Sequence, residues 1–247
     1  MMKPEPQIQF VYFDVDDTLL DHRHAEKQAL NALIARYPTA FDGISPQTVH
    51  EAYHRYNVHL WQQYAQGKIS KETLRFERFR HFREQFSIPE AVETLIQYYM
   101  QAYSNHWKWT QGAKEAFLLI ANHWPTGLLT NGFAEVQRAK LQRFPELQQH
   151  TRSIVISEEV GVMKPHPDIF TYATEQARVP PENILYVGDS FTSDVQGGQQ
   201  AGWQIAWFTS SPSTKPLPQV YPFSAWSELL TLLGLTTPNE TDTHAFF

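Results

Sequence analysis

Residues 9–21 read QFVYFDVDDTLLD, and this stretch decides the fold. It begins with apolar and aromatic residues, which are typical of a buried β-strand. Three acids follow within four positions: Asp14, Asp16 and Asp17. Like charges crowded at the end of a buried strand repel one another, and they cost stability unless something binds them. The stretch therefore predicts a strand that delivers acids to a binding site.

The composition is that of a globular protein with a sizeable core. The chain has 247 residues, of which 42% are hydrophobic and 19% charged, enough for a core domain with a smaller insertion. The net charge is −6 without a basic run, so we expect no nucleic-acid polymer as partner. The absence of cysteine excludes disulfides, thiolate catalysis and cysteine-based zinc sites. Without an apolar stretch of about 20 residues or a signal-peptide core, we expect a cytoplasmic protein that does not enter membranes.

The hydrophobic pattern changes twice along the chain. From residue 25 to about 106, apolar residues recur at helical spacing, with breaks at 38–45, 67–70 and 87–89. After residue 109, strand-like segments at 126–130, 153–157, 183–190 and 204–209 alternate with helical ones. This alternation predicts an α/β fold, a Rossmann-like parallel sheet with helices on both faces. The helical stretch predicts an all-helical cap inserted after the first strand. The predicted boundaries are 1–20 and 108–235 for the core, 21–107 for the cap and 236–247 for a flexible tail.

Polar residues follow several of the predicted strands. Thr130, Asn131 and Gly132 end one strand, and Asp189 ends another with Asp194 five residues further on. In an open parallel sheet, ligands bind beyond the carboxyl ends of the strands, and right-handed crossovers place these ends on one rim. The same rim should receive Lys164, which lies in the loop after the strand at 153–157.

This set of side chains suits magnesium and phosphate. Mg²⁺ prefers oxygen ligands, keeps several waters and shares the remaining positions with a phosphate. Asp14, Asp16 and Asp189 could provide the carboxylates. Lys164, the Thr130 hydroxyl and nearby backbone amides could neutralise and orient the anion. One carboxylate could attack phosphorus, and a second could hand a proton to the leaving oxygen.

Each motif also has a simpler interpretation. Residues 16–18 could cap the next helix, residues 130–132 and 188–189 could form turns, and Lys164 could be a solvated lysine. These four alternatives would have to coincide in the order that phosphate chemistry needs. The ordered set therefore favours a site.

Four segments carry a resemblance to a known family: DVDDT (14–18), LLTNG (128–132), GVMKPHPDIF (161–170) and GDSFTSD (188–194). They resemble the signature segments of the haloacid dehalogenase-like hydrolase superfamily, in the family's order and across the whole core. The helical insertion directly after the first segment is similar to the subgroup that carries a cap at this point.

The resemblance implies a role for each matching residue. Asp14 would be the nucleophile that becomes an aspartyl-phosphate, and Asp16 the general acid and base. Thr130 and the Asn131 amide would bind the transferring phosphoryl group. Lys164 would steady both Asp14 and the phosphate.

The resemblance also implies a magnesium site. The ion would be held by the Asp14 carboxylate, the backbone carbonyl of Asp16 and Asp189. Asp194 would support the ion's waters or Lys164 without being a direct ligand. His22 and His24 follow the acids, but we expect them to belong to a solvated first helical turn.

The implied activity is a magnesium-dependent phosphatase acting on a small phosphorylated metabolite. Within the capped subgroup the motifs are most similar to 5′-nucleotidases, which hydrolyse nucleoside 5′-monophosphates, and to the phosphatase acting on N-acylneuraminate 9-phosphate. A sugar-phosphate phosphatase or a sugar phosphomutase is the alternative. A dehalogenase is disfavoured because dehalogenases of this superfamily lack a carboxylate at the position of Asp16. A catalytically silent binding module is disfavoured because Asp14, Asp16, Lys164 and Asp189 are all present.

The cap would close over the leaving group and so decide which substrate is accepted. Arg75, Arg78 and Arg80 lie on one predicted helix of the cap. The simpler interpretation is a charged outer face. Arg78 is the residue that we expect to face the site if one does. The sequence leaves open whether the protein is a monomer or a homodimer.

Overall fold

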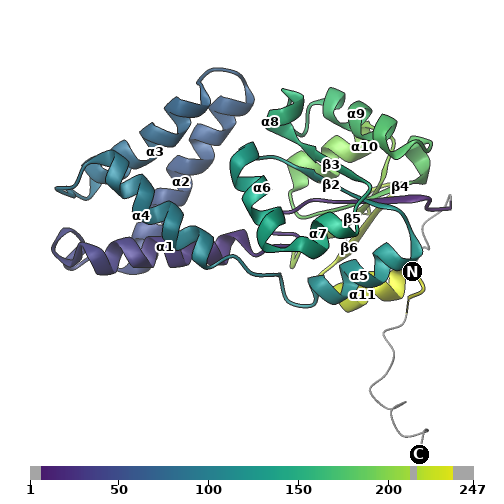
Figure 1. Ribbon diagram of the computed structural model, residues 1–247, viewed down its shortest axis with the longest axis horizontal. Helices are drawn as coiled ribbons and strands as arrows, with labels where there is room; N and C mark the ends of the chain where they lie inside the picture. The colour runs from purple at the N-terminus through teal and green to yellow at the C-terminus, as the bar shows by residue number, and fades with distance from the viewer. Residues whose placement is uncertain (1–6, 212–215, 236–247) are drawn as a thin grey trace, which may run out of the picture. The chain divides into compact units, whose positions relative to one another are not determined.

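The chain forms two compact units in the computed structural model, which describes residues 7–211 and 216–235 (Figure 1). The core unit comprises residues 1–20 and 109–247, and the helical unit comprises residues 21–108. Lys108 belongs to the helical unit because its carbonyl accepts a 3.0 Å hydrogen bond from the Asp21 amide. Its ammonium also lies 3.4 Å from the Asp21 carboxylate. The predicted tail, 236–247, lies outside the described residues.

A parallel sheet of six strands organises the core unit, in the order β3-β2-β1-β4-β5-β6. The predicted Rossmann-like α/β fold is thereby confirmed. The sixth strand was not predicted because it contains Pro222, which cannot donate to a ladder hydrogen bond. Such a residue is tolerated at a sheet edge, where this strand lies. The strands are β1 (Phe10–Phe13), β2 (Thr126–Thr130), β3 (Ser153–Ile156), β4 (Ile184–Gly188), β5 (Gln204–Phe208) and β6 (Val220–Phe223).

Helices cover both faces of this sheet (Figure 1). Helices α9 (Pro167–Ala177) and α10 (Gly197–Gln200) lie on one face, and α5 (Ala113–His123) and α11 (Trp226–Leu232) on the other. A π-helical segment, η3 (Phe191–Gln196), directly precedes α10. The remaining helices of the core unit are α6 (Ala134–Arg143), α7 (Pro145–Gln149), α8 (Ser157–Val160) and the short η2 (Pro181–Asn183).

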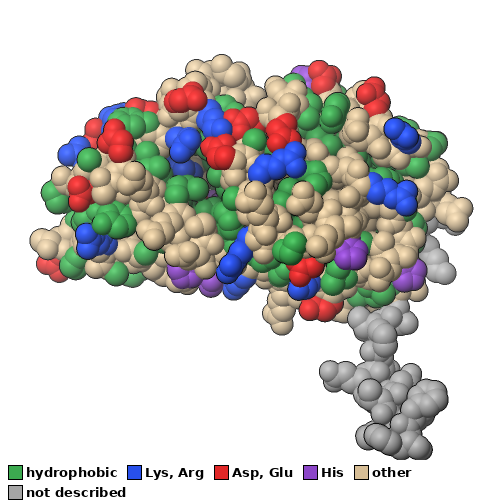
Figure 2. Space-filling model, viewed as in Figure 1, with side chains coloured by type: hydrophobic (Ala, Val, Ile, Leu, Met, Phe, Trp, Pro, Cys, Tyr) green, Lys and Arg blue, Asp and Glu red, His purple; other side chains and the backbone are tan. Residues whose placement is uncertain are grey.

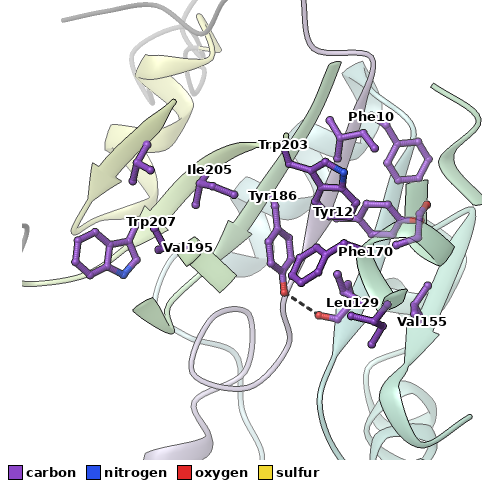
Figure 3. Packing of buried hydrophobic residues seen from close by; sticks show 14 residues of the cluster. Phe10, Tyr12, Leu129, Val155, Phe170, Tyr186, Val195, Trp203, Ile205 and Trp207 are labelled. Atoms are coloured by element: carbon purple, nitrogen blue, oxygen red, sulfur yellow. Dashed lines mark hydrogen bonds between the residues drawn. The ribbon is translucent and has the colours of Figure 1, made fainter. Parts of the chain in front are cut away.

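Strand β1 is buried on both faces, as expected for the centre of a parallel sheet. The Tyr12 ring stacks on Trp203 with centroids 5.3 Å apart (Figure 3). The Tyr12 hydroxyl donates to the Ala173 carbonyl of α9 at 2.8 Å. The next residue, Phe13, points to the opposite face and meets Phe117 of α5 at 5.3 Å. Because both faces are packed, the carboxyl end of β1 is held in place.

The helical unit contains α1 (His22–Arg36), η1 (Pro38–Phe41), α2 (Pro46–Ala65), α3 (Lys71–Gln85) and α4 (Val92–Asn105). Asp21 caps α1, since its carboxylate accepts the His24 amide at 2.9 Å. Residues 16–18 therefore do not cap this helix. Glu26 is buried inside the unit, where its carboxylate lies 3.1 Å from His54 Nδ1 and accepts from Asn57 at 3.4 Å.

The charges on the surface are mixed in sign. Figure 2 shows Lys and Arg side chains interspersed with Asp and Glu over the face in view. Arg138 and Glu159 form one such pair at 2.6 Å, and Arg80 and Glu77 another at 2.5 Å. Within the described ranges, no helix has both the length and the apolar character needed to cross a bilayer.

Candidate active site

Asp14 and Asp189 lie side by side at the carboxyl edge of the sheet. Asp14 follows β1 and Asp189 follows β4, the two neighbouring strands between which the strand order changes direction. Such a switch point is where open α/β sheets bind ligands. The Asp14 amide donates to the Val187 carbonyl at 2.8 Å. The Thr18 hydroxyl lies 3.2 Å from Asp14 Oδ2 and 3.4 Å from Asp189 Oδ1, so it bridges the two acids.

Lys164 lies among these acids rather than in solvent. Its side chain is buried, and its ammonium donates to three oxygens: Asp14 Oδ1 at 2.6 Å, Asp194 Oδ1 at 2.8 Å and the Tyr186 hydroxyl at 2.6 Å. All three ammonium protons thus have acceptors, as a buried lysine requires. The alternative of a solvated lysine is wrong.

Asn131 fastens the loop that carries Lys164 to the end of β2. Its side-chain amide donates to the Lys164 carbonyl, and its side-chain oxygen accepts the Lys164 amide, both at 2.9 Å. Thr130 is buried beside it, with its hydroxyl 3.3 Å from the Asn131 carbonyl. The Gly132 amide donates to the Ser157 hydroxyl at 3.2 Å and so has a partner within the protein. Phosphoryl binding by Thr130 and the Asn131 amide stays a prediction.

Asp194 supports Lys164 from η3. One carboxylate oxygen accepts from Lys164, and the other accepts the Ser190 amide at 2.9 Å. The carboxylate packs directly against the end of β4, because a Cβ at Gly188 would lie 2.6 Å from Asp194 Cγ. A glycine is therefore needed at 188 for this close approach.

The carboxylate of Asp16 faces helix α6. Lys140 donates to its Oδ1 at 2.5 Å, and Gln137 donates to its Oδ2 at 2.8 Å. Neither partner was predicted from the sequence, although the spacing of the two polar residues on one helix face was visible. Tyr186 was not predicted either, because its strand reads as plain apolar core.

Burial perturbs the charges of the site. It raises the pKa of Asp14 to about 7 and that of Asp189 to about 8; Lys164 opposes both shifts without cancelling them. Burial alone would lower the pKa of Lys164, but Asp14 and Asp194 outweigh it, and the net pKa lies above the ordinary value. The two carboxyls therefore retain protons near neutral pH unless a further positive charge arrives.

The acids can be tested as a metal site by their geometry. Asp14, Asp189 and Asp194 each present a carboxylate oxygen, and these atoms lie within 4.8 Å of one another. A set of oxygen donors suits a hard cation such as Mg²⁺. Asp194 accepts protein donors at both oxygens, and Asp14 accepts from Lys164 and Thr18, whereas the contact of Asp189 with Thr18 is longer, at 3.4 Å. Asp189 is therefore the best placed of the three to be a direct ligand.

Arg78, the predicted specificity residue, belongs to the helical unit. It lies on α3, where its guanidinium packs over the Phe79 ring at 4.9 Å and the Tyr99 ring at 5.6 Å. It also donates to Asn57 Oδ1 at 3.4 Å. Arg78 is therefore half-buried among aromatic rings, which differs from the charged outer face given by the simpler interpretation. Its role in specificity stays a prediction.

Comparison with known proteins identifies the family. The sequence profile of haloacid dehalogenase-like hydrolases matches residues 8–202. The chain belongs to this family. It is 31% identical to the pyrimidine 5′-nucleotidase YjjG of Escherichia coli, covering 84% of this chain and 88% of the relative. It is 25% identical to the N-acylneuraminate-9-phosphatase of Homo sapiens, with 85% and 86% covered.

A solved structure agrees with this assignment. The structure of the HAD-hydrolase YfnB of Bacillus subtilis bound to magnesium is similar, with a TM-score of 0.75 and 26% identity. The similarity covers 93% of this chain and 100% of that one. The predicted family and the predicted enzyme class, a phosphoric monoester hydrolase, are confirmed by these findings.

We expect Lys164→Met to lower the free energy of unfolding by about 3–5 kcal/mol at pH 8, because Asp14 and Asp194 would lose their shared ammonium in a buried site. The loss should be smaller at pH 5, where the carboxyls can take up protons instead. Urea unfolding in the presence of EDTA measures both values.

Arg138→Met is the matched control for this change. It removes an ion pair whose arginine side chain is 44% exposed, so the loss should stay below about 1 kcal/mol. Equal losses for the two variants at pH 8 would contradict the importance of the buried ion pairs.

Proposed function

We propose that this hydrolase is a magnesium-dependent phosphatase that acts through an aspartyl-phosphate at Asp14, with a nucleoside 5′-monophosphate as substrate. The observation that carries the proposal is the environment of Asp14. Its carboxylate is buried at the switch point, with Lys164 at 2.6 Å and the Thr18 hydroxyl at 3.2 Å. A carboxylate fixed in this way has a defined direction of attack and little water to displace.

The first step transfers the phosphoryl group to the protein. A carboxylate oxygen of Asp14 forms a bond to phosphorus while the ester bond from phosphorus to the leaving oxygen breaks. Asp16 gives its proton to the leaving oxygen, so that an alcohol departs rather than an alkoxide. Lys164 and the Thr130 hydroxyl stabilise the charge on the phosphoryl oxygens.

The second step regenerates the protein. Water forms a bond to phosphorus, its proton passes to Asp16, and the bond between phosphorus and the Asp14 oxygen breaks to release phosphate. Asp16 thus ends with the proton that it gave away in the first step. The same carboxyl serves as acid and then as base.

The acids fit a divalent ion by charge as well as by geometry. When ionised, Asp14, Asp189 and Asp194 exceed the ammonium of Lys164 by two negative charges, which equals the charge of one Mg²⁺. Asp14, Asp189 and the backbone carbonyl of Asp16 would hold the ion, with Asp194 fixing Lys164 beside it. The ion supplies positive charge that offsets the carboxylates and the phosphate.

The similarity to YjjG supports a nucleotide as the substrate, since it extends along 84% of this chain at 31% identity. The helical unit adds a chemical reason. Arg78 is half-buried and carries hydrogen-bond donors, while the rings that it packs on, Phe79 and Tyr99, are buried and hold it in place. A nucleobase offers matching acceptor atoms at its edge.

The alternatives are other reactions of the same family. The similarity to an N-acylneuraminate-9-phosphatase keeps a sugar phosphate as the second candidate substrate. A sugar phosphomutase would use the same nucleophile and acid but would return the phosphoryl group to the sugar. Dehalogenation is disfavoured because that reaction does not need the carboxyl that Asp16 provides.

We expect Asp14→Asn to lower phosphate release by at least about 1,000-fold, because the amide cannot attack phosphorus. The measurement is phosphate release from the best substrate of a phosphomonoester panel, with Mg²⁺ and with EDTA. Asp42→Asn, at an exposed aspartate of the helical unit, is the matched control and should retain full activity. Unchanged turnover in folded Asp14→Asn protein would refute the mechanism.

Magnesium affinity should rise with pH. The metal-free pKa of Asp14 is about 7 and that of Asp189 about 8, so below these values the ion must displace protons. Affinity should therefore increase up to about tenfold per pH unit for each proton displaced.

The stability of the metal-free protein should change with pH in the opposite direction to the magnesium affinity. Because both pKa values are raised above the unfolded value, their stabilising contribution is complete below about pH 4 and is lost as the pH rises through 7 and 8. Melting temperatures at pH 6 and pH 8.5, with and without Mg²⁺, test both statements. A magnesium-induced shift as large at pH 6 as at pH 8.5 would count against the site.

A panel of nucleoside 5′-monophosphates and sugar phosphates tests the substrate. We expect kcat/KM to be at least about tenfold higher for the best nucleotide than for the best sugar phosphate, a difference that one or two specific contacts can supply. A preference for sugar phosphates over every nucleotide would refute the nucleotide assignment. An isomerised sugar phosphate in place of free phosphate would identify a mutase.

A further inference from the structure

The carboxylate of Asp16 is held at both oxygens by one helix. Lys140 donates to Oδ1 at 2.5 Å and Gln137 to Oδ2 at 2.8 Å. The two donors are three residues apart on α6 and therefore project from the same helix face. Both donors are buried, with residue exposures of 2% for Lys140 and 3% for Gln137. The Asp16 carboxylate is thus held by two side chains of α6, whereas Lys164 contacts Asp14.

The segment between β2 and α6 is shaped to let this contact form. Gly132 directly follows the Thr130-Asn131 pair, and a Cβ at this position would lie 2.6 Å from Gln137 Nε2. The missing side chain leaves the space through which Gln137 reaches Asp16. Gly132 has a φ of 154°, within the range that residues with side chains rarely adopt.

Stability alone does not explain the choice of residues. The buried residues of α6 are Gln137, Lys140 and Leu141, so two of these three are polar. Burying an ammonium is costly, and replacing a buried ion pair by well-packed apolar residues is often neutral or stabilising. A helix that served only to cover the sheet would have apolar residues at 137 and 140. The polar pair points to a purpose in the chemistry of Asp16.

We propose that Lys140 and Gln137 are positioning residues that hold the Asp16 carboxyl in the orientation from which it transfers protons. The inference rests on the proposed function, in which Asp16 protonates the leaving oxygen. Two bonds to one rigid helix restrict both side-chain torsions of Asp16. A proton donor must lie within hydrogen-bond reach of the leaving oxygen, and a misplacement of about 1 Å can cost about 100-fold in rate.

The inference predicts a dependence on the leaving group. A sugar or nucleoside alkoxide is a poor leaving group and needs the proton from Asp16, whereas p-nitrophenolate departs with little help. The value of kcat/KM covers the steps up to formation of the aspartyl-phosphate, so it isolates this proton transfer. We expect Lys140→Met to lower kcat/KM by about 100-fold for the best alkyl phosphate and by less than about tenfold for p-nitrophenyl phosphate.

A double-mutant cycle tests whether Lys140 acts through Asp16. Adding Lys140→Met to Asp16→Asn should change kcat/KM for the alkyl phosphate by less than about threefold, because the group to be positioned is already gone. Lys114→Met is the matched control: this lysine is half-exposed in the core unit, pairs with Glu146 at 2.5 Å and should leave both substrates unaffected. If Lys140→Met does not fold, Gln137→Leu carries the same comparison.

The outcomes separate the inference from the proposed function. Two results would overturn the positioning role while the Asp14→Asn result still supports the phosphatase. One is an equal loss of kcat/KM for the two substrates. The other is that the losses of kcat/KM caused by Asp16→Asn and by Lys140→Met multiply in the double mutant. A wild-type protein without magnesium-dependent phosphate release would instead refute the proposed function, and the inference with it. A selective loss for the alkyl phosphate together with a non-additive cycle would establish the positioning role.

Discussion

The arrangement of the site depends on one buried cation. The ammonium of Lys164 is what allows Asp14 and Asp194 to lie next to each other at the end of a buried sheet. Tyr186 provides the third acceptor from β4, and Asn131 fixes the Lys164 backbone from β2. Strands β1, β2 and β4 are therefore tied together at a single point. The contact that ties these strands together at this edge is also the contact that orients the Asp14 carboxylate.

A second buried lysine, Lys140, gives Asp16 surroundings that differ from those of Asp14. Asp14 and Asp16 are separated by a single residue, yet Asp14 faces Lys164 and Asp16 faces Lys140 from another element. Strand alternation alone would not produce this separation, because residues two apart point the same way in a strand. The chain leaves the strand after residue 13, and the turn that follows sends the two side chains to different partners. Carboxyls in different surroundings can take different roles in one reaction.

The sequence predicted the positions of the site residues better than their partners. The ends of parallel strands share one rim, so the neighbourhood of Asp14, Thr130 and Asp189 followed from the order of the elements alone. The partners depend on where side chains turn, which periodicity does not report. Tyr186 was hidden in an apolar strand, and nothing in the sequence pattern marked Lys140 as buried. The edge strand β6 was missed for a local reason, its proline, which is acceptable there because the outer edge has no further strand to pair with.

The connection between the two units has an evolutionary consequence. Leu20 and Trp109 form an antiparallel bridge, and the next pair inward, Asp21 and Lys108, is joined by a hydrogen bond and an ion pair. The chain thus leaves the core unit and returns to it at adjacent points, so the ends of the insertion form a narrow neck. An insertion with such a neck can be exchanged for another of different length without altering a strand. The helical unit is in this sense a replaceable insertion, which could be exchanged by recombination while the carboxyl edge of the sheet was inherited unchanged.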